Sequence, residues 1–217
     1  MIKYLWNSIL DLLYPRKCVL CTKILSRRES DLCTSCRMNT ERVPHCVYRG
    51  KHFQGCYSVF YYKKDVASAV KKLKFSGKQL YGEAFGRLLA MKLLEENISA
   101  DVITWVPVSR KRKRKRGYDQ AEEIAKAVGR ELRLPVQGLL RKIRHNSAQA
   151  QIADHKMRKA NVENVYQIAD RLYIQDKRIL LIDDVITSGA TLDECSKILC
   201  KAGAKTIVCG TFAAAGS

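Results

Sequence analysis

The segment with the clearest chemical meaning runs from Arg178 to Leu192 and reads RILLIDDVITSGATL. Its leading apolar residues predict a strand buried on both faces, with two adjacent carboxylates, Asp183 and Asp184, at the carboxyl end. Small and hydroxyl-bearing residues follow and lead into a predicted helix. They are Thr187, Ser188, Gly189, Ala190 and Thr191. Because open α/β sheets bind ligands outside the carboxyl ends of their strands, we expect a ligand site here.

Each part of this segment suits one part of a phosphorylated sugar. A helix N-terminus offers free N–H groups and positive partial charge to a phosphate, and Gly189 lets the backbone approach closely. The carboxylates of Asp183 and Asp184 can accept hydrogen bonds from a pair of sugar hydroxyls. The alternative is a plain strand-to-helix turn with a capping residue, but a cap needs only one Asp. The second carboxylate and the loop therefore favour a sugar-phosphate site.

A second constellation lies upstream, where residues 106–120 read VPVSRKRKRKRGYDQ. Residues 110–116 are consecutive cations between a predicted strand and a helix that begins at Asp119. If that strand end lies beside the phosphate loop, the cations face an anion of pyrophosphate size, which Arg binds with a planar fork. Mutual repulsion predicts a mobile loop in the absence of ligand. The alternative is a nuclear-localisation signal or a non-specific polyanion patch.

The four earliest cysteines form two C-x-x-C pairs, Cys18 with Cys21 and Cys33 with Cys36, eleven residues apart. Tetrahedral zinc takes four thiolates in this arrangement, and each short loop directs two sulfurs to one ion. A stretch of this length has little core of its own, so the metal would supply folding free energy. A redox pair is the alternative, but two pairs at this spacing favour structural zinc.

The other five cysteines lack this spacing. Cys46 and Cys56, together with His45, could form an incomplete second metal site, although structural thiols are the simpler interpretation. Cys195, Cys200 and Cys209 lie in a predicted helix and strand, where we expect buried core thiols.

The composition limits the class of protein and its partners. The 217 residues carry a formal net charge of +19, which favours polyanions such as nucleic acid, nucleotide phosphates or an anionic membrane surface over a merely basic soluble protein. The first fifteen residues read as a short amphipathic helix ended by Pro15, because Asp11 interrupts the apolar run and no cleavage site follows. The run is also too short to span a bilayer. We therefore expect a cytoplasmic protein.

Strand-like and helix-like segments alternate through most of the chain, which predicts an α/β fold with a mainly parallel sheet flanked by helices. The expected strands are 57–62, 101–108, 178–184 and 206–212, and the expected helices are 65–74, 79–96, 119–131 and 192–202. Within 79–96 we expect one apolar face, formed by Leu80, Phe85, Leu88, Leu89, Met91, Leu93 and Leu94. We expect two domains: a helix with a four-Cys zinc module in residues 1–57, and the α/β domain in residues 58–217.

The LLIDDVITSGATL segment resembles the signature of type I phosphoribosyltransferases. In that family the paired acidic residues hold the ribose 2′- and 3′-hydroxyls of phosphoribosyl pyrophosphate (PRPP), and the small loop holds its 5′-phosphate. The resemblance carries the first role to Asp183 and Asp184, and the second to the loop from Thr187 to Thr191. Ser188 stands where Thr is common and keeps the hydroxyl.

Further motifs resemble the ComF family. VPVS followed by RGYDQA is similar to that family's V-P-V-P and R-G-F-N-Q-A, with Tyr118 for Phe and Asp119 for Asn. KKLKFSG (71–77) and RKANV (158–162) are similar to its L-K-Y/F-x-G and R-x-x-N-V segments. ComF proteins also carry an N-terminal cysteine module. The chain is therefore identified as resembling a ComF-type protein with a type I phosphoribosyltransferase domain.

The resemblance implies a PRPP- and Mg²⁺-binding phosphoribosyltransferase with an unknown acceptor. Asp183, Asp184 and Arg116 are then the expected catalytic residues, and Ser109 and Lys74 join the PRPP ligands. The spacing of lysines 71, 72 and 74 equally suits a solvated helix face. The resemblance also implies a role in competence and natural transformation, with single-stranded DNA and a competence helicase or other DNA-uptake proteins as partners. The alternative is a phosphoribosyltransferase of nucleobase or nucleotide metabolism unrelated to DNA uptake.

Overall fold

The computed structural model describes residues 15–46, 48–75, 79–144 and 165–216. The helix expected before Pro15 and the RKANV segment (158–162) lie outside these described residues. Within them, no helix combines the length and the apolar character that crossing a membrane requires.

A four-stranded parallel sheet forms the centre of the fold, in the order β1–β6–β5–β2. The strands are β1 (Cys56–Tyr61), β6 (Thr206–Ala214), β5 (Arg178–Ile186) and β2 (Val102–Trp105). Ile182 of β5 is in register with Trp105 on one side and with Gly210 on the other. The predicted parallel sheet is confirmed, with the strand that carries the paired carboxylates at an inner position.

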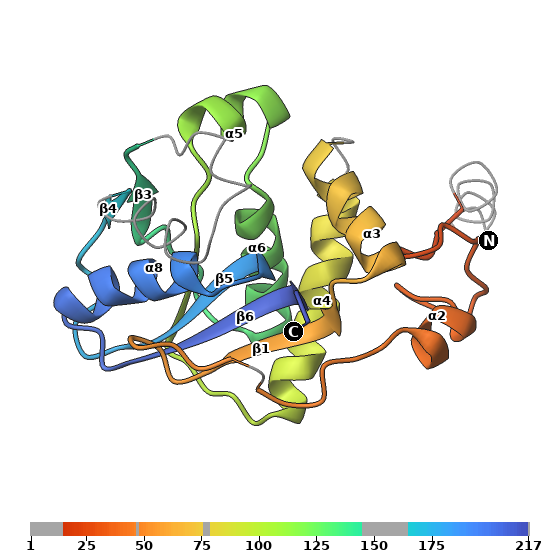
Figure 1. Cartoon of the computed structure of the whole chain (residues 1–217), viewed down its shortest axis with the longest axis horizontal. Helices are drawn as coiled ribbons and strands as arrows, with labels where there is room; N and C mark the ends of the chain where they lie inside the picture. Colours follow the sequence, from red (N-terminus) through yellow and green to blue (C-terminus); the bar gives the residue numbers. More distant parts are fainter. Residues whose placement is uncertain (1–14, 47, 76–78, 145–164, 217) are drawn as a thin grey trace, which may run out of the picture.

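Alternation along β5 divides its apolar side chains between two cores. Leu180 and Ile182 pack into the core under α4 (Gln79–Glu95) and α6 (Gln120–Leu132), whereas Ile179 and Leu181 pack into the core under α8 (Ala190–Lys201). The helices therefore cover both faces of the sheet, as Figure 1 shows. A strand buried on both faces carries apolar residues at consecutive positions, which is why its sequence lacks polar alternation.

The apolar face predicted for α4 is only partly correct. Phe85, Leu89 and Leu93 are fully buried at a spacing of four residues, and this spacing defines the inner stripe of a helix. Leu80, Met91 and Leu94 are instead exposed, because they lie off that stripe. Counting apolar residues over the whole segment overestimated the width of the buried face.

The cysteine-rich module lies at one end of the molecule and contains α2 (Thr34–Asn39) (Figure 1). Its apolar residues join the core that includes α3 (Lys64–Phe75) and α4. The guanidinium of Arg87 on α4 adds an ionic link, because its Nε donates to Asp31 Oδ2 at 3.0 Å. The module is therefore packed against the sheet domain through a shared core.

Two further elements stand above the sheet in Figure 1, away from the cysteine-rich module. One is α5 (Arg110–Arg116), and the other is an antiparallel ribbon of β3 (Leu140–Lys142) and β4 (Tyr166–Ile168) (Figure 1). The α5 helix follows the carboxyl end of β2, and the residues before β3 run parallel to β2, so α5 and β3 continue from the edge of the sheet where β5 ends. They are therefore placed to enclose a ligand at that edge.

Candidate functional site

Asp183 and Asp184 lie at the carboxyl end of β5. Asp184 is 9% exposed, and its backbone N–H donates to Asp183 Oδ1 at 2.8 Å. Burial and the neighbouring Asp184 carboxylate together raise the pKa of Asp183 well above its ordinary value. Two carboxylates held this close favour binding of hydroxyl donors or a cation, either of which relieves their repulsion.

Lys74, at the C-terminal end of α3, is brought to this carboxylate pair. Its Nζ lies 2.8 Å from Asp184 Oδ2, although the two residues are distant in the sequence. Burial lowers the pKa of Lys74, but attraction to Asp184 outweighs burial and the net pKa is raised. Lys74 therefore stays cationic at the mouth of the site, where it can face an anion.

The loop after β5 leads directly into α8. Gly189 is the N-cap of that helix, with a left-handed φ of 72° that favours glycine, and the cap makes no side-chain hydrogen bond among the described residues. Its carbonyl accepts from Asp193 N at 2.9 Å. The sequence also allowed a plain turn capped by an Asp, Ser or Thr side chain. The structure shows a glycine N-cap instead. The first N–H groups of α8 are therefore available to an anion.

The cationic run 110–116 forms the helix α5 rather than the loop that the sequence predicted. Ser109 is its N-cap and accepts from Arg112 N at 3.4 Å, and Gly117 ends it with a φ of 83°. Lys113 also pairs with Glu122 on α6 at 2.6 Å. A side-chain cap, a glycine end and this ion pair together offset the repulsion among neighbouring cations.

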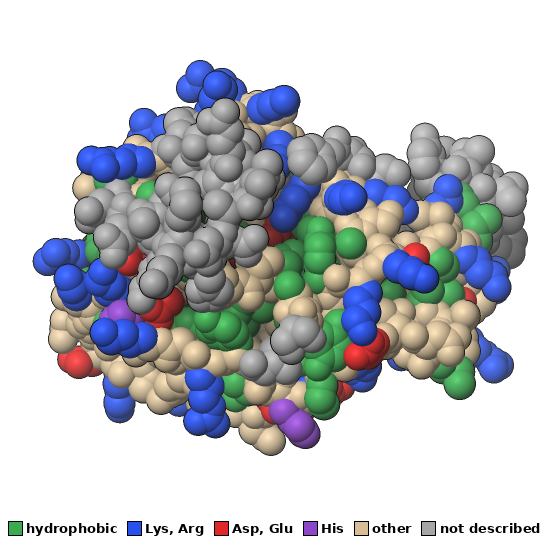
Figure 2. All heavy atoms as spheres, viewed as in Figure 1, with side chains coloured by type: hydrophobic (Ala, Val, Ile, Leu, Met, Phe, Trp, Pro, Cys, Tyr) green, Lys and Arg blue, Asp and Glu red, His purple; other side chains and the backbone are tan. Residues whose placement is uncertain are grey.

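The cations of α5 divide between the outside and the site. Arg116 is half-buried, and the charge of Asp184 acts on it; burial and Arg112 nevertheless lower the pKa of Arg116. The other cations of the helix are exposed and gather at the top of Figure 2. Arg116 is therefore the least exposed cation of α5, and the charge of Asp184 in the carboxylate pair acts on it.

Two buried residues of the RGYDQ motif hold α5 and α6 in place. Asp119 Oδ2 accepts from Val108 N at 2.8 Å, and its Oδ1 accepts from Ala121 N at 3.1 Å, so Asp119 is the N-cap of α6 as predicted. Burial raises the pKa of Asp119 to about 6. The Tyr118 hydroxyl donates to the Leu73 carbonyl, next to Lys74. Tyr118 is 5% exposed and belongs to the core, which excludes it as a base-stacking platform.

Cys18, Cys21, Cys33 and Cys36 form a single cluster in which all four Sγ atoms lie within 4.8 Å of one another. The Sγ atoms of Cys21 and Cys33 are 3.6 Å apart. Tetrahedral zinc with Zn–S bonds of about 2.3 Å separates its sulfurs by about 3.8 Å, so this cluster fits the ion. Although burial raises it, backbone hydrogen bonds lower the pKa of Cys18 to about 7, whereas burial raises the pKa of Cys21 and of Cys36, so Cys18 ionises more readily than these two thiols.

Comparison with known protein families assigns both parts of the chain. The phosphoribosyl transferase domain family matches residues 115–217, and the double zinc ribbon domain family matches residues 9–62. The first match contains the carboxylate pair and its loop, and the second contains the four-Cys cluster. The type I phosphoribosyltransferase fold with an N-terminal zinc module, predicted from the motifs, is confirmed.

Three curated relatives share this organisation over most of their length. Competence protein F of Haemophilus influenzae is 25% identical and covers 88% of this chain and 93% of its own. Competence protein ComFC of Streptococcus pneumoniae is 26% identical, with coverages of 88% and 96%. DNA utilization protein YhgH of Escherichia coli K12 is 24% identical, with coverages of 88% and 86%. The chain is thus similar to ComF-type proteins over most of its length.

The second cysteine set does not belong to a cluster of potential metal ligands within the described residues. His45 faces Glu96 at 3.6 Å, Cys46 Sγ lies 3.3 Å from the Tyr48 carbonyl, and Cys56 is fully buried in the sheet. The interpretation of Cys46 and Cys56 as structural thiols stays a prediction.

The expectation of buried core thiols in the sheet domain is correct for Cys195 and Cys209, which are fully buried. It is wrong for Cys200, which is exposed near the end of α8. The last turn of an amphipathic helix turns this position toward solvent.

Several side chains near the site have no signal in the sequence. Lys142 and Tyr166 face each other across the β3–β4 ribbon, with the Lys142 ammonium 5.2 Å from the ring centroid, and the charge of Asp183 acts on both. Tyr48 and His52 contact the loop after β5 and the first turn of α8. These residues come from other parts of the chain, and no motif marks them.

Proposed function

We propose that this protein binds PRPP with Mg²⁺ at the carboxyl end of β5. The observation that carries the proposal is the arrangement at this strand end. Two adjacent carboxylates lead into a glycine-capped helix N-terminus without a side-chain cap, on an inner strand of a parallel sheet. A sugar with vicinal hydroxyls and a terminal phosphate fits this order of groups.

Each end of PRPP has its own set of residues. Asp183 and Asp184 accept hydrogen bonds from the ribose hydroxyls, and the loop residues with the first N–H groups of α8 bind the 5′-phosphate. The loop residues are Thr187, Ser188, Gly189, Ala190 and Thr191. Lys74, Arg116 and the backbone around Ser109 face the pyrophosphate. Lys74 supports this assignment because its ammonium lies 2.8 Å from Asp184.

The reaction that suits this site is transfer of the phosphoribosyl group. The bond between ribose C1 and the pyrophosphate oxygen breaks, pyrophosphate leaves with the electron pair, and an acceptor nucleophile forms a new bond to C1. Lys74 and Arg116 would stabilise the negative charge that develops on the leaving pyrophosphate. Bound Mg²⁺ supplies further neutralisation of those phosphate oxygens. No described side chain at the carboxylate pair is required as a base if the acceptor nitrogen arrives unprotonated.

We extend the proposal to single-stranded DNA, with the exposed cations of α5 as the contact surface. Support comes from the net charge of +19 and from relatives whose names concern competence and DNA utilization. A competence helicase or other DNA-uptake proteins would be partners in natural transformation. We include a cytoplasmic location in this proposal, because cysteines that bind zinc without forming disulfides are typical of a reducing compartment.

The domain boundary between residues 1–57 and 58–217 also stays a prediction.

The DNA part is tested by the salt dependence of oligonucleotide affinity. If α5 neutralises phosphates, the logarithm of the association constant falls steeply with the logarithm of salt concentration, by about 0.7 per phosphate contact. Replacing Lys111, Arg114 and Lys115 with Gln should reduce that slope. A slope near zero in the unaltered protein would remove α5 as a DNA contact and favour a role in nucleobase metabolism.

The PRPP part is tested with Asp183→Asn combined with Asp184→Asn. The double variant keeps the size of both side chains but loses both negative charges and replaces one acceptor oxygen of each with an NH₂ donor, so PRPP affinity should fall at least about a hundredfold. Asp65→Asn with Asp176→Asn is the matched control, because it removes two exposed carboxylates. Unchanged affinity in the first double variant would refute the assignment of the pocket.

A further inference from the structure

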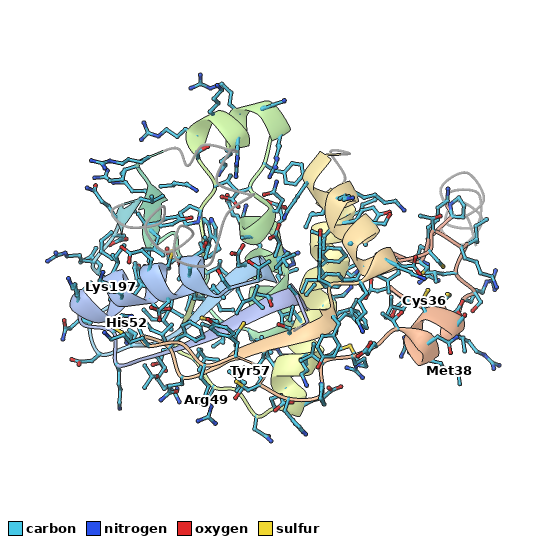
Figure 3. All side chains as sticks on the ribbon, in the orientation of Figure 1. Cys36, Met38, Arg49, His52, Tyr57 and Lys197 are labelled. Atoms are coloured by element: carbon cyan, nitrogen blue, oxygen red, sulfur yellow. The ribbon has the colours of Figure 1, made fainter. Side chains whose placement is uncertain are left out.

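Cys46 and residues 48–54 lie between α2 and β1 in the chain, and Tyr48 and His52 of this segment contact the loop after β5 and α8. Figure 3 labels His52 beside α8, next to Lys197 of that helix. This segment, which we call the brace, belongs to the region that matches the double zinc ribbon domain, yet its cysteine is not part of a metal cluster among the described residues. Its contacts indicate a different use.

Tyr48 closes over the loop from outside. Its hydroxyl donates to the carbonyl of Ser188, which is separated from it by 140 residues. Its ring also covers Gly189 so closely that a Cβ at that position would overlap it. Gly189 is thus required twice, for its left-handed φ of 72° and for the space that the Tyr48 ring occupies.

His52 engages both carboxylate oxygens of Asp193 in the first turn of α8. Its backbone N–H donates to Asp193 Oδ1 at 2.9 Å, and its Nδ1 lies 3.1 Å from Asp193 Oδ2. An acidic side chain in the first turn of a helix commonly bonds the free N–H groups there. Among the described residues, the Asp193 carboxylate is bonded to His52 and to no N–H group at the start of α8, so those N–H groups stay available to another anion.

The brace is itself fixed to the sheet, so it can impose a position on the loop. The backbone N–H of Cys56 donates to the Tyr48 carbonyl at 2.9 Å, and Gln54 N donates to the Ile207 carbonyl at 2.9 Å. The rings of Tyr48 and Phe53 stack with centroids 6.0 Å apart. These contacts tie both ends of the segment to ordered strands.

We propose that Tyr48 and His52 are positioning residues for the phosphate-binding loop. Tyr48 holds the loop backbone at Ser188 and Gly189, and His52 holds Asp193 away from the N-terminus of α8. The inference rests on the proposed function, since it assigns both residues to the 5′-phosphate end of PRPP. Pyrophosphate is bound by other elements and does not depend on the brace.

The test is calorimetric titration with ribose 5-phosphate and, separately, with Mg²⁺ and pyrophosphate. Tyr48→Phe removes only the hydroxyl, and His52→Ala removes the imidazole. Each should weaken ribose 5-phosphate binding by about two- to tenfold and leave pyrophosphate binding unchanged. A general loss of structure would weaken both ligands. His52→Asn, whose amide nitrogen can replace Nδ1 as a donor to Asp193, should restore most of the affinity.

The possible outcomes distinguish failure of the proposed function from failure of the role proposed for the brace. If the unaltered protein binds neither PRPP nor ribose 5-phosphate, the proposed function fails and the role of the brace fails with it. If the unaltered protein binds ribose 5-phosphate and both Tyr48→Phe and His52→Ala bind it equally well, the brace alone is refuted. Loss confined to ribose 5-phosphate, with recovery in His52→Asn, supports the proposal.

Discussion

The two halves of the zinc-ribbon region are stabilised in different ways. Residues 18–36 hold four cysteines whose Sγ atoms lie within 4.8 Å of one another, a cluster that fits one metal ion. The second half contains two cysteines, Cys46 and Cys56, and Cys46 Sγ bonds to the Tyr48 carbonyl. Backbone hydrogen bonds join this second half to the sheet, and His52 joins it to α8. The first half depends on a metal, whereas the second depends on the phosphoribosyltransferase-type domain and contacts its phosphate loop. One family of domain can therefore supply both a metal site and a support for a ligand site.

The strongest test of this contrast is to remove one thiol from each half. Cys36→Ser should abolish stoichiometric zinc binding and lower the unfolding temperature markedly, because structural zinc contributes about 10 kcal/mol or more in small zinc domains. Cys46→Ser should keep the zinc and change stability little, since a hydroxyl can also donate to the Tyr48 carbonyl. Zinc content by metal analysis and thermal unfolding measure both effects. Equal losses in the two variants would mean that the second half also binds metal.

The two loops at the ligand edge of the sheet are also held in different ways. The Tyr48 hydroxyl of the brace donates a hydrogen bond to the loop after β5. The loop after β2 instead donates a hydrogen bond to the Asp119 carboxylate. Burial raises the pKa of Asp119 to about 6 in the folded protein, from 3.8. The folded state thus binds the proton more tightly than the unfolded state, and Asp119 contributes stability at low pH that is lost as pH rises from about 4 to about 6.

Asp119→Asn removes this pH dependence. Relative to the variant, the unaltered protein should lose up to about 3 kcal/mol of unfolding free energy as pH rises through this window. Chemical denaturation of both proteins at several pH values gives the difference directly. Asp65→Asn, at an exposed carboxylate, is the control and should show no comparable change. A constant difference between Asp119→Asn and the unaltered protein would show that Asp119 is solvated.

A smaller effect concerns the ionic link that attaches the first half to α4. Arg87→Ala leaves the Asp31 carboxylate, 7% exposed, without its bidentate partner and should lower the unfolding free energy by about 1–3 kcal/mol. Arg42→Ala, which breaks an exposed pair with Glu95, is the matched control and should cost less than about 1 kcal/mol. If the two variants are equally stable, the shared apolar core alone attaches the module.

The sequence predicted what lies within contiguous segments. The carboxylate pair with its loop, the parallel strands, the Asp119 cap and the four-Cys cluster are all encoded by neighbouring residues or short spacings. The cationic run was misjudged because charge repulsion was weighed without the Ser109 cap and the Lys113–Glu122 pair. Tyr48 and His52 could not be predicted, since each contacts a residue about 140 positions away and no local pattern announces it.

The most direct test of the central claim is calorimetric titration of the zinc-loaded protein with PRPP in the presence of Mg²⁺. The carboxylate pair and the glycine-capped start of α8 predict saturable binding of one PRPP per chain, with a dissociation constant in the micromolar range. Absence of binding at millimolar PRPP would contradict the account. It would leave the fold as a scaffold whose function rests on the cations of α5 and the zinc module.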